Sequence, residues 1–288
     1  MISSQKIAFI GPGVMAEAMI SGLIRNHTTG PEMLTAAGPT LERLSHLAGK
    51  YGIHTTTDNS EAACAADIVV LTVKPQRLDK VFQGLRGCIN PASLVISIIA
   101  GATIEKLSHG LGQSLIVRSM PNTPAQIGEG ITVWTSSKKV SEEQRQMARQ
   151  ILLALGDEIF VEDETYLDMA TALSGTGPAY VFLFMEAMVD AGVHLGFPRR
   201  IAEQLVAQTV RGSVDFYRTH EDSVHLARLR NQVTSPGGTS AAALYYLEKA
   251  GFRTAISRAV WAAYERSREL GKSSKPRDPE EDQAQNDD

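Results

Sequence analysis

The sequence has few of the residues that build metal centres or disulfide frameworks. It contains two cysteines, Cys64 and Cys88, without CxxC spacing, and its seven histidines form neither HxxH nor HxH pairs. Structural zinc sites and disulfide-stabilised folds depend on more cysteines and histidines at closer spacing. We therefore expect both cysteines to be reduced residues packed in the core, and we expect no bound metal.

An excess of positive charge and a long apolar run are also missing. The 28 Lys and Arg residues are outnumbered by 32 Asp and Glu residues, which gives a net charge of -4. Nucleic-acid-binding surfaces are instead rich in Lys and Arg. No uninterrupted apolar run approaches the roughly 20 residues that span a bilayer, and the polar start before Ile7 does not resemble a signal peptide. We expect a cytoplasmic protein with neither nucleic acid nor a membrane as partner.

The first half of the sequence alternates short apolar runs with helix-length segments. From Lys6 to about Val161 this alternation is typical of βαβ units, which build parallel sheets. A chain of 288 residues with 43% hydrophobic content has room for about two domains. The first is predicted to be an α/β Rossmann-type dinucleotide-binding domain with a parallel sheet, residues 1–162. The expected strands, apolar on both faces because helices cover them, are Ile7–Ile10, Leu34–Ala37, Ile68–Val73, Leu94–Ile98, Leu115–Val117 and Ile131–Trp134.

The second half is predicted to be an all-α domain, residues 163–271, because apolar residues recur there at three- and four-residue intervals. The segment Val181–Val193 is apolar nearly all round, interrupted chiefly by Glu186 and Asp190, so a helix there needs burial on several sides. We infer a subunit interface, making the chain a homodimer or higher homo-oligomer through this dimerisation domain, with a compact monomeric bundle as the alternative. Residues 272–288 lack large apolar side chains and are predicted to be a disordered acidic tail.

A glycine-containing turn follows the first expected strand. Gly11, Pro12, Gly13, Val14 and Met15 lie between Ile7–Ile10 and a helix-like segment, which is the setting of a dinucleotide fingerprint. Gly11 permits the tight turn, and Gly13 lets the backbone approach a pyrophosphate at the helix N-terminus. These five residues are predicted to bind the cofactor; the alternative is a glycine-rich turn without a ligand.

The end of the second strand indicates which nucleotide is bound. NAD-binding proteins usually place Asp or Glu there against the ribose hydroxyls, but this sequence has Gly38, Pro39 and Thr40. No carboxylate repels a 2′-phosphate at that point, Thr40 can donate a hydrogen bond, and Arg43 lies one turn on. We therefore expect these three residues to contact the cofactor and NADP(H) to be preferred, with NAD(H) possible if the segment is only a turn.

Four further polar or Gly/Pro-rich segments carry a family resemblance. They are Thr72–Pro75, Met120–Pro124, Leu173–Tyr180 and Val233–Ser240. In this order, on a Rossmann domain followed by a helical one, the sequence resembles pyrroline-5-carboxylate reductase over nearly its whole length. The resemblance implies dimers built through the helical domains, often assembled into larger rings.

The first two of these segments follow strands and so are expected at the carboxyl edge of the sheet, where α/β proteins bind ligands. The resemblance implies cofactor contacts for Asn59, Val73, Lys74, Pro75, Ala100, Asn122 and Thr123. Two of these have an ordinary alternative. Lys74 could be a solvated lysine, and Asn59 could belong to a helix cap formed by Asp58-Asn59-Ser60.

The last segment is predicted to receive the substrate. Gly237 and Gly238 stand before an apolar helix-like run, so backbone N–H groups and hydroxyls gather at a helix start, which suits a carboxylate. The resemblance implies substrate contacts for Glu164, Ser235, Gly238, Thr239 and Ser240, with the Ser240 hydroxyl, often a threonine in the family, facing the ring nitrogen as the catalytic group. The alternatives are a helix cap without a ligand and, for Glu164, an exposed linker carboxylate.

The implied reaction is the last step of proline biosynthesis, in which hydride from NADPH reduces the cyclic imine 1-pyrroline-5-carboxylate to L-proline. Ser174 to Tyr180 is interpreted as a glycine loop that lets the long helix pass close to the nicotinamide domain. Rival functions are another NADP-dependent imine or β-hydroxyacid oxidoreductase and a non-catalytic nucleotide-binding regulator. β-Hydroxyacid dehydrogenases place a catalytic lysine four residues beyond the second glycine of this loop, where this sequence has Val181 after Gly177.

Overall fold

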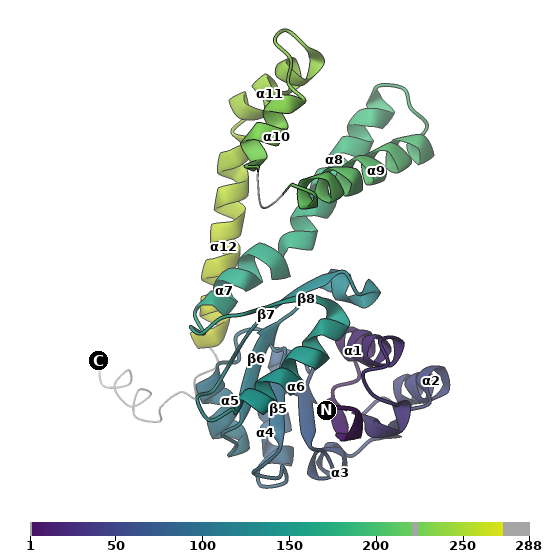
Figure 1. The fold of residues 1–288 in the computed structure, drawn as a ribbon, viewed down its shortest axis with the longest axis vertical. Helices are drawn as coiled ribbons and strands as arrows, with labels where there is room; N and C mark the ends of the chain where they lie inside the picture. The colour runs from purple at the N-terminus through teal and green to yellow at the C-terminus, as the bar shows by residue number, and fades with distance from the viewer. Residues whose placement is uncertain (1, 221–223, 273–288) are drawn as a thin grey trace, which may run out of the picture. The chain divides into compact units, whose positions relative to one another are not determined.

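A computed structural model of the chain describes residues 2–220 and 224–272 (Figure 1). The chain divides into two compact units: one contains the residues up to Thr176 together with those from Ala263 onward, and the other is Gly177–Ala262. The predicted boundary near residue 162 follows the change from strands to helices. In the division by compactness, the helical turns after residue 162 and the end of the last helix belong to the same unit as the sheet.

The first unit is built on an eight-stranded sheet in the order β3-β2-β1-β4-β5-β6-β7-β8. The strands β1 to β6 run parallel, β7 is antiparallel to β6, and β8 is parallel to β7. Their bounds are β1 Ile7–Ile10, β2 Leu34–Ala37, β3 His54–Thr56, β4 Ile68–Leu71, β5 Leu94–Ser97, β6 Ile116–Met120, β7 Gly130–Ser136 and β8 Gly156–Phe160.

The predicted Rossmann-type architecture with a parallel sheet is confirmed, with one departure, because β7 runs antiparallel to β6. Parallel neighbours need a long crossover connection, usually a helix. Between Met120 and Gly130 the chain forms only a short 3₁₀ turn, η4 (Thr123–Ile127), so it turns back on itself. The strands β3 and β8 were not predicted, because both are half-exposed and largely polar edge strands.

Helices pack on both faces of this sheet and create two apolar layers. Side chains alternate along a strand, so Ile7 and Phe9 of β1 join one buried cluster while Ala8 and Ile10 join the other. The helices of this unit are α1 Val14–Arg25, α2 Leu41–Tyr51, α3 Asn59–Cys64, α4 Leu78–Leu85, α5 Ile104–Leu111, α6 Glu142–Leu152 and α7 Tyr166–Ala170, with 3₁₀ turns η1 Ile2–Ser4, η2 Pro31–Met33, η3 Pro75–Arg77 and η5 Leu153–Leu155.

Two local expectations for this unit are overturned. Cys64 is exposed and Cys88 half-buried, both as free thiols, so they are not core residues. The segment Ser174 to Tyr180 is not a loop, since a π-helix (η6, Thr171–Gly175) leads almost directly into α8. Within η6, a Cβ on Gly175 would lie 3.0 Å from Met120 Cε at the end of β6, so this glycine allows a close contact inside the first unit.

The second unit consists of helices with little buried apolar surface of their own. They are α8 Gly177–His194, α9 Arg199–Arg218, α10 Leu226–Gln232, α11 Thr239–Lys249 and α12 Phe252–Lys272, the last of which returns to the first unit from Ala263. Its small core centres on Val189, Ala202 and Val206. Large apolar side chains remain exposed, among them Val181, Phe182, Leu183, Phe184, Leu205, Phe216, Tyr245, Tyr246 and Trp261.

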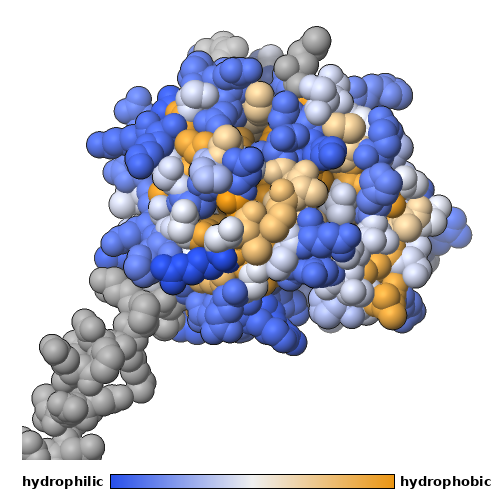
Figure 2. Space-filling view, turned by 90° about the horizontal axis from the view of Figure 1, so that it is seen from below, coloured by the Kyte–Doolittle hydropathy of each residue, from blue (hydrophilic) through white to orange (hydrophobic). Residues whose placement is uncertain are grey.

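Among the described residues, one helical run, Tyr166–His194, is long and apolar enough to cross a membrane by length and composition alone. A single run of this kind is weak support for a membrane span. The face of the molecule in Figure 2 mixes hydrophilic side chains with small apolar groups, as expected of a surface in water. The predicted acidic tail lies outside the described residues, except for Lys272, which is the last residue of α12.

Candidate nucleotide and substrate sites

The turn after β1 is shaped by a glycine that no other residue could replace. Gly11 has a φ of +101°, and its N–H donates to the carbonyl of Ala37 over 2.9 Å. A Cβ at this position would lie 2.7 Å from Val73 Cγ1 and 2.9 Å from Val73 N. The Thr72 hydroxyl also donates to the Gly11 carbonyl over 2.7 Å. The turn is therefore held against the end of β4 and cannot shift to accept a side chain.

The second glycine of the turn leaves room for a ligand. Gly13 is the N-cap of α1, and the nearest heavy atom to a Cβ built there is 4.0 Å away. The first N–H groups of a helix have no carbonyl partner within the helix and carry a partial positive charge. Open space in front of such amides fits a pyrophosphate. The residues predicted for this contact, Gly11 to Met15, thus form one surface at the start of α1.

The end of β2 lies beside this surface. A Cβ on Gly38 would collide with Pro12 Cδ, so glycine is required for the two turns to pack together. Thr40 is the N-cap of α2, and its hydroxyl makes no capping hydrogen bond within the described chain. The Thr40 hydroxyl is therefore free to contact a ribose or its 2′-phosphate.

The guanidinium of Arg43 makes hydrogen bonds and an ion pair with other residues of the protein. Its Nε donates to the Pro12 carbonyl over 2.8 Å and its Nη2 to the Gly13 carbonyl over 3.3 Å. The same Nη2 lies 2.5 Å from Glu17 Oε2 in the first turn of α1. This side chain therefore ties α2 to the phosphate-binding turn. An additional contact of Arg43 with a 2′-phosphate stays a prediction.

Glu17 is the centre of this tie. Its Oε1 accepts hydrogen bonds from Lys50 Nζ over 2.9 Å and from the Tyr51 hydroxyl over 3.0 Å. Partial burial raises the pKa of the Glu17 carboxyl, but hydrogen bonds from Lys50, Arg43 and Tyr51 outweigh it and bring the pKa from 4.5 to about 2. The carboxylate is consequently ionised throughout the physiological range.

Asn59 begins α3 but does not cap it. Asp58 is the N-cap, and its carboxylate accepts from the N–H groups of Ser60 and Glu61. The Asn59 Oδ1 atom is buried without a hydrogen-bond partner among the described residues. Buried polar atoms are rarely left unpaired, and a bound ligand is a common reason. The alternative interpretation of Asp58-Asn59-Ser60 as a helix cap is confirmed, with Asp58 as the capping residue. The unpaired acceptor of Asn59 also fits a ribose hydroxyl, so its cofactor contact stays a prediction.

The remaining predicted cofactor residues follow the carboxyl ends of neighbouring strands. Val73, Lys74 and Pro75 come after β4, Ala100 after β5, and Asn122 and Thr123 after β6. Parallel strands bring their carboxyl ends to one edge of a sheet, so these residues share that edge with Gly11 to Met15. Asn122 also has a structural task, since it donates to the Ser174 carbonyl over 3.2 Å and accepts from Ile131 N over 3.0 Å.

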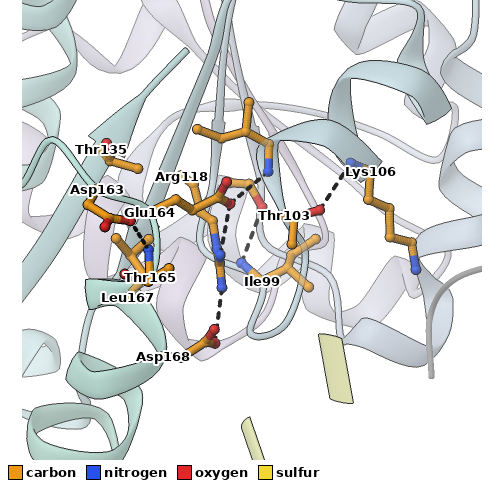
Figure 3. A network of polar contacts seen from close by, with 12 residues as sticks. Ile99, Thr103, Lys106, Arg118, Thr135, Asp163, Glu164, Thr165, Leu167 and Asp168 are labelled. Atoms are coloured by element: carbon orange, nitrogen blue, oxygen red, sulfur yellow. Dashed lines mark hydrogen bonds and ion pairs between the residues drawn. The ribbon is translucent and has the colours of Figure 1, made fainter. Parts of the chain in front are cut away.

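Glu164 takes part in a network of polar contacts that sequence reasoning missed (Figure 3). Its Oε1 accepts from Ile104 N and from Arg118 Nη1, each over 2.8 Å. Arg118 lies on β6 with a side chain only 4% exposed, and its Nη2 is 3.5 Å from Asp168 Oδ1. The signal was available in the sequence, because Arg118 directly follows the apolar run Leu115–Val117, and a buried arginine needs a carboxylate partner. Glu164 is thus not a free linker carboxylate.

The predicted substrate residues other than Glu164 lie at the start of α11 in the second unit. Gly237 has a φ of +71°, and Gly238 is the N-cap, with its N–H donating to the Ser235 carbonyl over 3.0 Å. The first bond into the helix runs from Ala242 N to the Gly238 carbonyl over 3.2 Å. The amides of the first turn before Ala242, with the half-buried Ser240 among them, therefore have no helical partner and can receive a carboxylate.

Comparison with known sequences shows what the chain is similar to. Residues 164–270 match the family model described as pyrroline-5-carboxylate reductase dimerisation, and residues 6–101 match the model described as NADP oxidoreductase, coenzyme F420-dependent. The pyrroline-5-carboxylate reductase of Synechocystis is 44% identical over 269 residues, which cover 93% of this chain and 99% of that protein.

Solved structures are similar over the same length. Pyrroline carboxylate reductase from Plasmodium falciparum, with NADP bound, has a TM-score of 0.85 at 34% identity and covers 93% of this chain and 99% of its own. The pyrroline-5-carboxylate reductase of Coxiella burnetii has a TM-score of 0.83 at 38% identity, with 93% and 98% covered.

Proposed function

The chain belongs to the pyrroline-5-carboxylate reductase family, and from that premise we propose how its own residues carry out the reaction. The protein is an oxidoreductase that reduces 1-pyrroline-5-carboxylate to L-proline with NADPH. The observation that supports this most directly is the presence of two sets of unpaired helix-start amides, one before α1 and one before α11. One suits a pyrophosphate and the other a carboxylate, and the reaction needs both.

The cofactor is held by the carboxyl edge of the sheet. Gly11 to Met15 bind the pyrophosphate, while Gly38, Pro39 and Thr40 line the ribose that carries the 2′-phosphate, where no carboxylate repels it. The free acceptor of Asn59 takes a ribose hydroxyl. The nicotinamide is bordered by the residues that follow β4, β5 and β6, namely Val73, Lys74, Pro75, Ala100, Asn122 and Thr123. When bound, NADPH supplies the hydride.

The start of α11 binds and orients the imine. The amides near Gly238 and Thr239, together with Ser235, hold the substrate carboxylate. The Ser240 hydroxyl then hydrogen-bonds the ring nitrogen, and water delivers the proton because a serine hydroxyl is a poor acid at neutral pH. Placing the two reacting carbons in near-attack geometry contributes about 7 kcal/mol in favourable cases. The substrate contact of Glu164 remains a prediction, since its carboxylate already accepts bonds from Ile104 and Arg118.

The chain acts as a homodimer or larger homo-oligomer joined through its helical unit. The helix α8 exposes Phe182 and Leu183 by 62% and 66%, which is more apolar surface than a solvated helix carries. A second copy covering this face explains the exposure without a membrane, and residues 164–270 match a family model described as a dimerisation domain. The two free thiols suit the reducing cytoplasm, where we place the protein.

The test of the proposed function is an absorbance assay at the NADPH band with 1-pyrroline-5-carboxylate, run beside NADH. Imine-dependent loss of absorbance, faster with NADPH, is expected. No loss of absorbance with a folded protein that binds NADPH would favour the non-catalytic regulator instead. Oxidation of NADPH that does not depend on the imine would favour another NADP-dependent oxidoreductase. The β-hydroxyacid dehydrogenase alternative lacks its lysine, because Val181 stands at that place on α8.

A further inference from the structure

The buried Arg118 lies next to two segments of the first unit: the one just before the chain leaves this unit and the one just after it returns. Arg118 follows the fully buried Ile116 and Val117 on β6, and its own side chain is 4% exposed. A buried guanidinium is costly unless carboxylates and hydrogen bonds compensate it. Its two partners, Glu164 and Asp168, both lie on the segment that leads toward α8 (Figure 3).

The helix α12, on which the chain returns to the first unit, also contacts Asp168. Ser267 lies on the part of α12 that belongs to the first unit, and it is 3% exposed. The Ser267 hydroxyl donates to Asp168 Oδ1 over 2.8 Å. That same oxygen is 3.5 Å from Arg118 Nη2. One carboxylate oxygen therefore joins the outgoing segment, the returning helix and β6.

The end of α12 also contacts a loop that is proposed to border the nicotinamide. A Cβ built on Gly101, which has a φ of +73°, would lie 3.1 Å from Gly271 N and 3.2 Å from the carbonyl carbon of Leu270. Gly101 directly follows Ala100. The Glu164 carboxylate meanwhile accepts from Ile104 N at the start of α5, which follows the same loop.

We propose that Arg118, Glu164, Asp168 and Ser267, named here the Arg118 cluster, are positioning residues for the reduction of the imine. The proposal rests on the proposed function. Every residue assigned to NADPH belongs to the first unit, whereas Ser235 to Ser240 lie on the excursion between residues 177 and 262. Within the first unit, the cluster fastens the end of α12 and the start of α5 to β6. The residues proposed to border the nicotinamide lie next to these elements, since Ala100 precedes Gly101 and Asn122 and Thr123 continue β6. Loosening the cluster displaces these residues and impairs hydride transfer to the imine, while the turn that binds the pyrophosphate of NADPH stays intact.

Ser267→Ala tests this proposal, with Ser93→Ala as the matched control. Both serines are 3% exposed residues of the first unit, and each hydroxyl donates one hydrogen bond, over 2.8 Å to Asp168 for Ser267 and over 2.7 Å to the Ala66 carbonyl for Ser93. Ser93 lies before β5, at the opposite edge of the sheet. Both variants are expected to lower the Tm of the full-length protein to a similar extent, so a general loss of stability is the same in both.

The kinetic outcome separates positioning from stability. Ser267→Ala is expected to lower kcat/KM for the imine about tenfold, because small misplacements of reacting groups are costly, while the Kd for NADPH by fluorescence titration stays unchanged. Ser93→Ala should leave both quantities near wild type, and Ser267→Thr, which keeps the hydroxyl, should restore kcat/KM. Asp168→Asn, which retains an acceptor for Ser267 but weakens the Arg118 pair, should give an intermediate loss.

Equal kinetics for Ser267→Ala and Ser93→Ala would overturn the proposal, as would a loss of NADPH affinity that parallels the loss of activity. If Ser267→Ala does not fold, Asp168→Asn supplies the same comparison. Failure of the proposed function is a distinct result, because the wild-type protein would then show no imine-dependent oxidation of NADPH.

Discussion

Removing the charge of Glu17 should destabilise the protein at neutral pH and loosen the phosphate-binding turn. Glu17→Gln keeps the size of the side chain but leaves Arg43 and Lys50 without their carboxylate. A tenfold change in an ionisation constant corresponds to about 1.4 kcal/mol, so a pKa lowered from 4.5 to about 2 corresponds to about 3 kcal/mol. Lys50 is 52% exposed and its contribution is screened by solvent, which reduces the expected loss to about 2 kcal/mol.

The sign of the pH dependence follows from the lowered pKa of Glu17. The folded protein binds this proton more weakly than the unfolded chain, so the stabilisation is fully present above pH 4.5 and is lost as the pH falls toward 2. Wild type and Glu17→Gln should therefore differ most at pH 7 and converge in the acid range. Urea unfolding followed by circular dichroism between pH 7 and the acid limit of folding measures this difference.

The loss of the Glu17 charge should also weaken NADPH binding, because Arg43 links Glu17 to the phosphate-binding turn. Its guanidinium holds the carbonyls of Pro12 and Gly13, so its release should raise the Kd for NADPH about fivefold, which corresponds to about 1 kcal/mol. Glu142→Gln is the control, because Glu142 is 70% exposed and lies 3.7 Å from Arg145 on the surface. The reasoning is refuted if Glu17→Gln unfolds at the same urea concentration as this control at pH 7.

Three further results are expected. Gly13→Ala meets no protein atom but fills the space in front of the α1 amides, so the Kd for NADPH by titration should rise at least about tenfold, whereas Gly49→Ala, in equally open space on α2, should leave it unchanged. Ser240→Ala should lower kcat/KM for the imine without changing the Kd for NADPH, and unchanged steady-state kinetics would remove Ser240 from the mechanism. Phe182→Glu should shift the protein toward monomers in light scattering, whereas Leu153→Glu, at an exposed apolar position of the first unit, should not; an unchanged mass for Phe182→Glu would place the subunit interface elsewhere.

The sequence by itself determined those features that depend on neighbouring residues. The strand Ile7–Ile10 and the turn that begins at Gly11 are found as expected, and the capping box of Ser141 with Gln144 is a further feature of this local kind. Each results from hydrogen bonds, backbone dihedrals or side-chain alternation within a few residues, so a short window contains the cause. The same holds for the apolar helix α8, whose need for a partner is visible in Val181–Val193.

The tertiary structure alone decided which distant polar groups meet. Arg43 pairs with Glu17, 26 residues earlier, and Arg118 pairs with Glu164, 46 residues later. The reversal at β7 likewise depends on how the chain packs after Met120. Charged side chains are long and flexible, and many partners are compatible with any one sequence. Only the packing of helices and strands selects among these partners, because burial makes an unpaired charge too costly to keep.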